Sequence, residues 1–174
     1  MQVFLIRHPR PLIEPGLCYG QLDVDCEDPL PIAARLRSRL PADTTIIASP
    51  LKRARRLAEA LDPQIRIDER LREINFGDWE GQPWDEIDRS AIDQWAADVL
   101  HFVPPGGESV ASLQQRVIDF ATALSATLDA PRVAIVSHAG VMRALFGHWR
   151  QLPASEWMQL KFDFASVTEI EVAQ

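Results

Sequence analysis

The stretch "VFLIRHPRP", residues 3–11, joins a continuous apolar run to an arginine, a histidine and two prolines. Two further apolar runs, residues 45–48 and 133–136, end in a similar way, at Ser49 and at Ser137-His138. Short runs rich in β-branched residues are typical of strands buried on both faces, as in parallel sheets covered by helices. These segments therefore predict an α/β fold.

Helical patterns separate the predicted strands. Apolar stripes with helical spacing run over residues 32–40, 51–61, 84–99, 110–128 and 141–149. We expect the second helix to begin with Ser49 as its cap and Pro50 as its first residue. Residues 65–67 predict a further strand, and alternating apolar and acidic residues over 168–172 predict an edge strand. The expected architecture is a three-layer sandwich, a mostly parallel sheet with helices on both faces, in one domain over residues 1–174.

The composition excludes several classes of protein. The chain is 47% hydrophobic and 25% charged, as in ordinary globular proteins, and its net charge of -7 argues against binding to nucleic acid. No apolar run is long enough for a membrane span, and Arg7 interrupts the first run too early for a secretory signal. We therefore expect a cytoplasmic protein that does not associate with membranes. Cys18 and Cys26 lack metal-ligand spacing and are predicted to be free thiols.

The strand ends predict a site for a phosphorylated ligand. In open α/β sheets, ligands bind beyond the carboxyl ends of the strands, which would gather Arg7, His8, Ser49 and His138 at one edge. Arg53 lies one turn beyond the second strand. Guanidinium groups bind phosphate oxygens in a bidentate manner, and a neutral imidazole is a nucleophile near neutral pH. Because arginines can supply the positive charge, no metal or other cofactor is expected.

Attack on a phosphate ester also requires a proton donor for the departing oxygen. The stretch "RLREINFGDWEG", residues 70–81, offers Glu73, Asp78 and Glu80. We favour Glu73 because it follows the predicted strand 65–67, and we expect Glu80 to bond a backbone N–H in its own loop. The negative charge of a bound phosphate favours the protonated form of a neighbouring carboxyl group.

Four motifs in order resemble the histidine phosphatase superfamily, which includes the cofactor-dependent phosphoglycerate mutases. They are "LIRHP" (5–9), "SPLKRARRLA" (49–58), "LREINFGDWEG" (71–81) and "VSHAG" (136–140), and together they extend over nearly the whole chain. The resemblance implies a phosphoglycerate mutase-like fold and a phosphohistidine intermediate. It implies that His8 is the nucleophile, that Glu73 donates the proton, and that Arg7, Arg53 and His138 bind the phosphoryl group.

Within the superfamily, the stretch "CYGQLDV" (18–24) and the short chain are most similar to the alpha-ribazole phosphatases. The resemblance implies hydrolysis of the 5′-phosphate of alpha-ribazole phosphate, or of adenosylcobalamin phosphate, in cobalamin biosynthesis. The mutase pattern places substrate contacts at Tyr19 and Gly20. Trp79 and Trp84 are expected in the core, with a wall for an aromatic base as the alternative.

Two residues depart from the family pattern. Pro9 replaces the usual glycine after the histidine, but its carbonyl can still accept a hydrogen bond from the ring of His8. Glu14 stands where an asparagine is common, and a carboxylate would repel phosphate, so we expect no phosphate role for it.

Three other functions remain open from the sequence. The chain could be a broad-specificity phosphatase acting on sugar phosphates or nucleotides, or a phosphoglycerate mutase that excludes water from its intermediate. It could also be a catalytically silent phosphate-sensing domain. The short chain favours the hydrolase, and the complete set of phosphate-binding residues argues against the silent domain.

Overall fold

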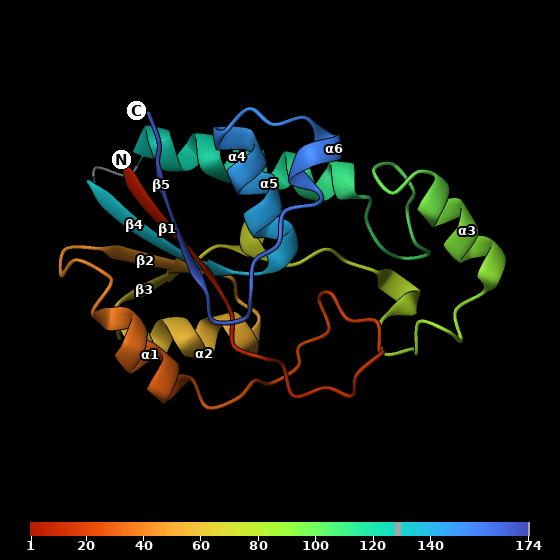
Figure 1. Ribbon diagram of the computed structural model, residues 1–174, viewed down its shortest axis with the longest axis horizontal. Coiled ribbons are helices and arrows are strands. Elements are labelled where there is room, and N and C mark those ends of the chain that lie inside the picture. Colours follow the sequence, from red (N-terminus) through yellow and green to blue (C-terminus); the bar gives the residue numbers. More distant parts are fainter. Residues whose placement is uncertain (128–129, 174) are drawn as a thin grey trace.

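The computed structural model describes residues 1–127 and 130–173 and contains a five-stranded sheet with the order β3-β2-β4-β1-β5. The strands are β1 (Gln2–Arg7), β2 (Thr45–Ala48), β3 (Ile65–Ile67), β4 (Arg132–Ser137) and β5 (Val167–Glu171). Neighbouring strands from β3 to β1 pair in parallel, and β5 pairs with β1 in the antiparallel direction at one edge. The predicted mostly parallel sheet with an edge strand at its end is confirmed (Figure 1).

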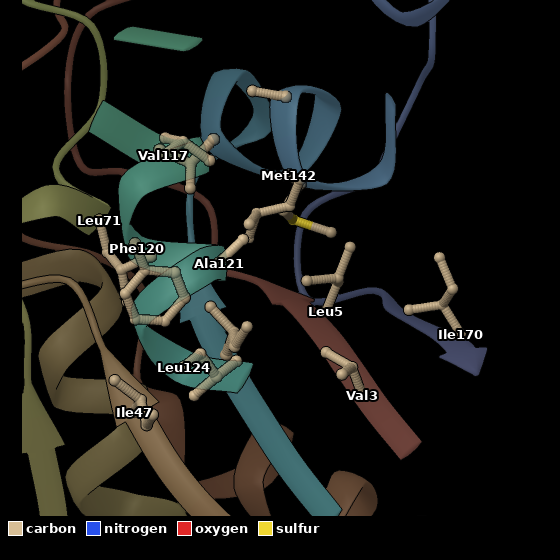
Figure 2. Close-up of a cluster of buried hydrophobic side chains, with 14 of the residues drawn as sticks. Val3, Leu5, Ile47, Leu71, Val117, Phe120, Ala121, Leu124, Met142 and Ile170 are labelled. Carbon is tan, nitrogen blue, oxygen red and sulfur yellow. The ribbon is translucent and has the colours of Figure 1, made fainter. Parts of the chain in front are cut away.

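Helices cover both faces of the sheet (Figure 1). Those on one face are α1 (Pro29–Arg37) and α2 (Lys52–Leu61), and those on the other are α4 (Val110–Thr127), α5 (Ala139–Trp149) and α6 (Ala154–Trp157). Alternate residues of each central strand face opposite layers, as a period of two requires. Val3 and Leu5 pack among the residues of α4 and α5 (Figure 2), whereas Phe4 and Ile6 pack against α1 and α2.

The first residue predicted for α2 was wrong. The helix begins at Lys52, and Leu51 is its N-cap, without a capping side chain. Ser49 and Pro50 instead form the turn between β2 and the helix. The hydroxyl of Ser49 accepts a bond from the backbone N–H of Leu51 at 3.3 Å and, at 2.8 Å, contacts the ring of His138. The serine is therefore engaged with the site at the strand end.

The predicted helix over residues 84–99 is shorter in the structure. Helix α3 (Arg89–Ala97) has no fully buried residue, and it projects away from the sheet (Figure 1). Trp84 and Ile87 precede it in a turn because Asp88 is the N-cap and accepts a bond from a backbone N–H in the first turn. The predicted stripe of α4 included Leu128, which lies outside the described residues.

A separate aromatic cluster joins α3 to the rest of the molecule. It contains the buried residues Cys18, Trp79 and Ile87 and the half-buried residues Phe76, Trp84, Ala91, Ile92, Trp95 and Phe102. The rings of Trp84 and Trp95 stack with centroids 5.7 Å apart. Both cysteines are free, as predicted, and burial raises the pKa of the Cys18 thiol to about 12. None of the helices in the described part of the chain has the length and apolarity needed to cross a membrane.

Candidate active site

Two imidazoles that are distant in sequence meet at the carboxyl ends of β1 and β4. These strands pair in parallel with Arg7 opposite Ser137, so His8 and His138 each follow the last pair of the ladder. Their ring centroids are 5.0 Å apart, and both side chains are almost completely buried. The sheet register therefore sets the distance between the two rings.

The conformation of His8 leaves one ring nitrogen free. Its Nδ1 lies 2.6 Å from the carbonyl oxygen of Pro9, which can only accept, so the proton is on Nδ1 and the lone pair is on Nε2. The expectation that Pro9 keeps this acceptor is confirmed. Burial lowers the pKa of His8 to about 3, and the positive charges of Arg53 and Arg7 contribute to the decrease. The ring is therefore neutral around pH 7.

His138 lies at the start of α5 and is held by a different contact. Its Nε2 is 2.8 Å from the hydroxyl of Ser49, while its buried Nδ1 has no hydrogen-bond partner among the described residues. Burial lowers the pKa of His138 well below the usual value, and the charge of Arg53 and the nearby ring of His8 lower it further. This ring is also neutral at pH 7.

Arg53 is completely buried in the first turn of α2. Its guanidinium donates to the carbonyl oxygens of Leu22 at 2.9 Å and Gly20 at 2.5 Å. A Cβ at position 20 would lie 1.9 Å from the carbonyl oxygen of Ile74, so only glycine fits there. Gly20 thus orients an arginine through its backbone and is not among the cavity-lining residues, whereas Tyr19 lines the cavity with its ring 5.3 Å from the Arg53 guanidinium carbon.

Arg7, the last residue of β1, contacts the segment that leads into β5. Its guanidinium donates to the carbonyl of Phe162 at 2.6 Å and lies 3.8 Å from the centre of the Phe164 ring. The sequence did not predict either aromatic residue near the site, since no local pattern shows where the segment before β5 passes. The Nε atoms of Arg7 and Arg53 are buried and have no partner within the described part of the chain.

The three acidic candidates have different environments. Glu73 lines the same cavity as His8, and its carboxylate accepts bonds from the backbone N–H groups of Ile74 at 3.0 Å and Gly140 at 3.1 Å. Glu80 accepts bonds from backbone N–H groups, that of Phe76 in its own loop included, as predicted. Neither Glu80 nor Asp78 is among the cavity-lining residues.

The cavity has a volume of about 330 Å³ and two chemically different ends. Its polar end contains Arg7, His8, Tyr19 and Glu73. Arg53 and His138 are not among the lining residues, but they lie against Tyr19 and His8, respectively. Its apolar wall includes Phe76, Trp84 and Trp95 from the aromatic cluster, and Trp79 remains in the core behind them. Arg143 on α5 adds a further cation to the lining.

Two further expectations concern Glu14 and metal-binding side chains. Glu14 is exposed and is not among the cavity-lining residues. No group of three or more histidine, cysteine, aspartate or glutamate residues that could hold a metal ion occurs in residues 1–127 and 130–173.

Residues 3–174 match the family described as the histidine phosphatase superfamily (branch 1). The adenosylcobalamin/alpha-ribazole phosphatase of Salmonella typhimurium is 27% identical over 100% of this chain and 92% of its own length. The phosphoserine phosphatase 1 of Hydrogenobacter thermophilus is 28% identical over 100% of this chain and 88% of its own. The glucosyl-3-phosphoglycerate phosphatase of Mycolicibacterium vanbaalenii is 33% identical over 79% and 68%, respectively.

Solved structures share the whole fold. A candidate alpha-ribazole-5′-P phosphatase from Escherichia coli superimposes with a TM-score of 0.89 at 26% identity, covering 100% of this chain and 91% of that chain. A mycobacterial glucosyl-3-phosphoglycerate phosphatase superimposes with a TM-score of 0.80 at 28% identity, covering 97% and 88%. The fold and these relatives define a phosphoric monoester hydrolase of the α/β class. The chain belongs to the histidine phosphatase superfamily.

Proposed function

We propose that the chain hydrolyses a phosphomonoester through a phosphohistidine formed on His8. The observation that supports this most strongly is the state of the His8 ring, which is neutral, buried and bonded through Nδ1. Its Nε2 lone pair is thereby available for attack on phosphorus. The second ring, that of His138, has its centroid 5.0 Å away and supplies a phosphoryl-binding group, and the carboxyl group of Glu73, which lines the same cavity as His8, supplies a proton donor.

The reaction has two steps. In the first, Nε2 of His8 forms a bond to phosphorus, the phosphorus–oxygen bond to the leaving group breaks, and Glu73 gives its proton to the departing oxygen. In the second, a water oxygen attacks phosphorus, the phosphorus–nitrogen bond breaks, and the Glu73 carboxylate takes a proton from that water. Phosphate leaves, and both residues return to their initial protonation states.

Arg7, Arg53 and His138 bind the phosphoryl oxygens in this proposal. Each has a buried ring or guanidinium nitrogen without a hydrogen-bond partner among the described residues. Charge on the transferring group spreads over its oxygens in the transition state, where fixed guanidinium groups stabilise it. Arg53 is especially suitable because two carbonyls already hold its guanidinium in place before substrate binds.

The apolar wall supports alpha-ribazole phosphate, or adenosylcobalamin phosphate, as the substrate. Trp84 and Trp95 stack on each other, and Phe76 meets Trp84 edge to face with ring centroids 5.3 Å apart. All three line the cavity, where a flat aromatic base on the leaving group would contact them. The Salmonella relative, which matches over the full length of this chain, is named an adenosylcobalamin/alpha-ribazole phosphatase.

Arg143 favours a second candidate, a small phosphate ester with a carboxylate on its leaving group. Its Nε donates to the carbonyl of Leu160 at 2.7 Å, and its terminal amino groups have no partner among the described residues. A guanidinium fixed at one end and free at the other suits a bidentate carboxylate. This alternative includes phosphoserine and 3-phosphoglycerate.

Two experiments test the proposal. Acid quenching with a 32P-labelled substrate should trap labelled wild-type protein, and His8→Ala should lose the label with its fold retained; an unlabelled wild-type protein would favour a silent phosphate-sensing domain. Parallel measurements of kcat/KM should rank alpha-ribazole phosphate above phosphoserine and fructose phosphates, and Trp84→Ala should reduce that preference. A preference for phosphoserine that Arg143→Met abolishes would favour the second candidate, and isomerisation of 3-phosphoglycerate without phosphate release would indicate a mutase.

A further inference from the structure

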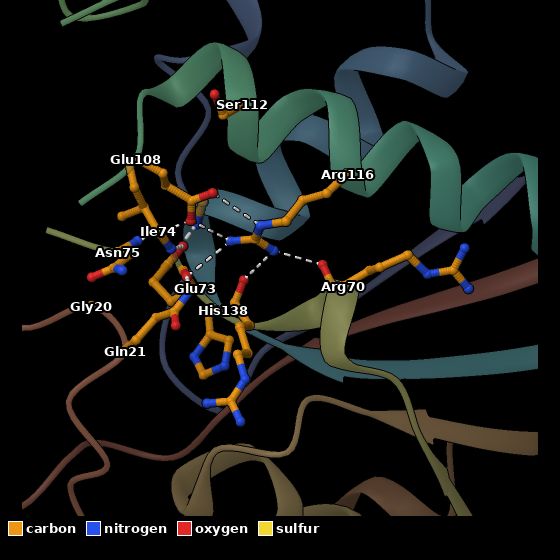
Figure 3. Close-up of polar contacts among 12 residues, drawn as sticks. Gly20, Gln21, Arg70, Glu73, Ile74, Asn75, Glu108, Ser112, Arg116 and His138 are labelled. Atoms are coloured by element: carbon orange, nitrogen blue, oxygen red, sulfur yellow. Dashed lines mark hydrogen bonds and ion pairs between the residues drawn. The ribbon is translucent and has the colours of Figure 1, made fainter. Parts of the chain in front are cut away.

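One side chain of α4, that of Arg116, binds the backbone of the loop that carries Glu73. The guanidinium of Arg116 donates through Nη1 to the carbonyl oxygens of Arg70 and Arg72, both at 2.7 Å, and through Nη2 to that of Glu73 at 3.0 Å. Figure 3 shows this guanidinium between α4 and the loop. One residue therefore binds three carbonyl groups within four positions of the chain.

The same guanidinium is neutralised by Glu108, just before α4. Its Nη2 lies 2.7 Å from one carboxylate oxygen of Glu108, and its Nε lies 3.2 Å from the other. Glu108 in turn binds the loop, because its carboxylate accepts from the backbone N–H of Asn75 at 3.0 Å. The backbone N–H of Glu108 also donates to the carbonyl of Asn75 at 2.8 Å. The pair thus holds the loop on both sides of Glu73.

The number of hydrogen bonds that Arg116 makes equals the number of N–H donors on its guanidinium group. Arg116 makes five N–H contacts, and a guanidinium has five N–H groups in one plane. A lysine has three donors on a flexible stem and could not keep this geometry. The pair is also largely buried, with side-chain exposures of 22% for Arg116 and 19% for Glu108, so that solvent screens it less than a surface pair.

The backbone of the surrounding loop is held by side chains from other elements rather than by a strand or helix of its own. It lies between β3 and the aromatic cluster, and residues 72–76 belong to neither helix nor strand. The carbonyl of Leu71 accepts from the hydroxyl of Ser137 at 2.8 Å, and that of Glu73 accepts a second bond from Gln21 at 3.1 Å. All the carbonyls from residue 70 to residue 73 are therefore held by side chains from other elements, and Arg116 contacts three of the four.

We propose that Arg116, together with Glu108, is a positioning residue that aims the carboxyl group of Glu73 at the leaving oxygen. The inference rests on the proposed role of Glu73 as the proton donor. The pair does not touch the substrate; it fixes the backbone from which the Glu73 side chain extends. Its loss should therefore impair protonation of the leaving group and leave phosphoryl binding nearly unchanged.

The dependence of kcat/KM on the leaving group tests this inference. Expulsion of p-nitrophenolate needs little help from an acid, whereas expulsion of an alkoxide needs it strongly. In Arg116→Met, kcat/KM should fall about 10–100-fold for an alkyl phosphate and less than about threefold for p-nitrophenyl phosphate. Arg116→Lys and Glu108→Gln should give smaller effects with the same selectivity. Equal losses on both substrates in these variants would overturn the inference and indicate a merely structural role.

Arg70→Met is the matched control. Its guanidinium also connects the loop to α4, through the carbonyl of Asp119 at 3.1 Å, but its other bonds go to Asp68 rather than to residues 72–75. Arg70→Met should change thermal stability without changing the ratio of the kcat/KM values for the alkyl phosphate and p-nitrophenyl phosphate. If Arg116→Met does not fold, the ratios for Arg116→Lys and Glu108→Gln decide the question.

Glu73→Gln separates failure of the inference from failure of the proposed function. If this variant loses no more activity on the alkyl phosphate than on p-nitrophenyl phosphate, the role of Glu73 itself is wrong. If it shows the selective loss and the Arg116 and Glu108 variants do not, only the positioning role fails. In the Glu73→Gln background, Arg116→Lys should cause no further selective loss, because the group that it positions is already unable to donate a proton.

Discussion

Replacement of Gly140 by alanine should reduce catalytic activity without reducing the stability of the fold. This glycine is the second residue of α5, and its backbone N–H donates to Glu73 at 3.1 Å. A Cβ at position 140 would lie 2.3 Å from Oε1 of Glu73 and 3.1 Å from its Cδ. Ordinary van der Waals contact would therefore require the carboxylate to move away by about 1 Å, a displacement that can lower the rate of a catalysed step about 100-fold.

The same substitution should not weaken the helix. Alanine is favoured over glycine by at most about 1 kcal/mol per helical residue, so the melting temperature of Gly140→Ala should be unchanged or slightly higher. We expect kcat/KM for an alkyl phosphate to fall about 100-fold and that for p-nitrophenyl phosphate to fall much less. Steady-state kinetics on both substrates and a thermal melt check these expectations.

Two comparisons make the test specific. In Gly147→Ala, on the same helix, the new Cβ would lie 2.5 Å from that of Trp157, so this variant should lose stability through overpacking. In a Glu73→Gln background, Gly140→Ala should have no further effect, since the methyl group acts through the carboxyl group. Wild-type activity of Gly140→Ala on the alkyl phosphate would refute the assigned position of the proton donor.

Other predictions follow from the buried groups of the site. The folded-state pKa of His8 is about 3, below the usual value of about 6.5 in the unfolded chain, and that of His138 is also lowered. The unfolded chain then binds more protons below about pH 6.5, so the free energy of unfolding should decrease as the pH is lowered, by up to about 1.4 kcal/mol per pH unit for each histidine. Chemical denaturation between pH 7 and 5 should show a smaller dependence of this free energy on pH for His8→Gln than for wild type. Arg53→Ala should lower turnover by orders of magnitude and cost about 1–3 kcal/mol in urea unfolding, because the carbonyls of Gly20 and Leu22 lose their donor; near wild-type turnover would contradict its phosphate role. Vanadate should inhibit competitively and EDTA should have no effect; activity lost in EDTA and restored by a divalent cation would reveal a required metal.

Several features of the fold and site follow from local patterns. The strand from Val3 to Ile6 and its partner from Val133 to Val136 are continuous apolar runs, and such runs are stable only when both faces are covered. The order of polar residues after each run, together with the rule for parallel sheets, was sufficient to expect His8 and His138 at one edge. Similarly, Pro9 has no N–H and no polar side chain, so its carbonyl was the only group that could form a hydrogen bond with the ring.

Other features depend on segments that meet only in the folded chain. Helix α2 begins at Lys52 rather than at Pro50, and Ser49, in the turn before it, contacts His138, a residue that the local sequence does not bring near it. Helix α3 is short because Asp88 caps it, which leaves Trp84 in the preceding turn, where it stacks on Trp95 within the aromatic cluster. Local helical spacing describes one face of an isolated helix, whereas the packing of a peripheral helix depends on what the rest of the chain presents to it.

By itself, the sequence determined the α/β class, the parallel core and the residues that stand at the strand ends, because burial on both faces and strand direction are properties of short segments. Only the tertiary structure decided how these residues are aimed. Gly20 and Leu22 orient Arg53, Phe164 covers Arg7, and Arg116 secures the loop of Glu73. Each of these contacts joins positions that are distant in the chain, so its geometry exists only after the loops have packed against the sheet.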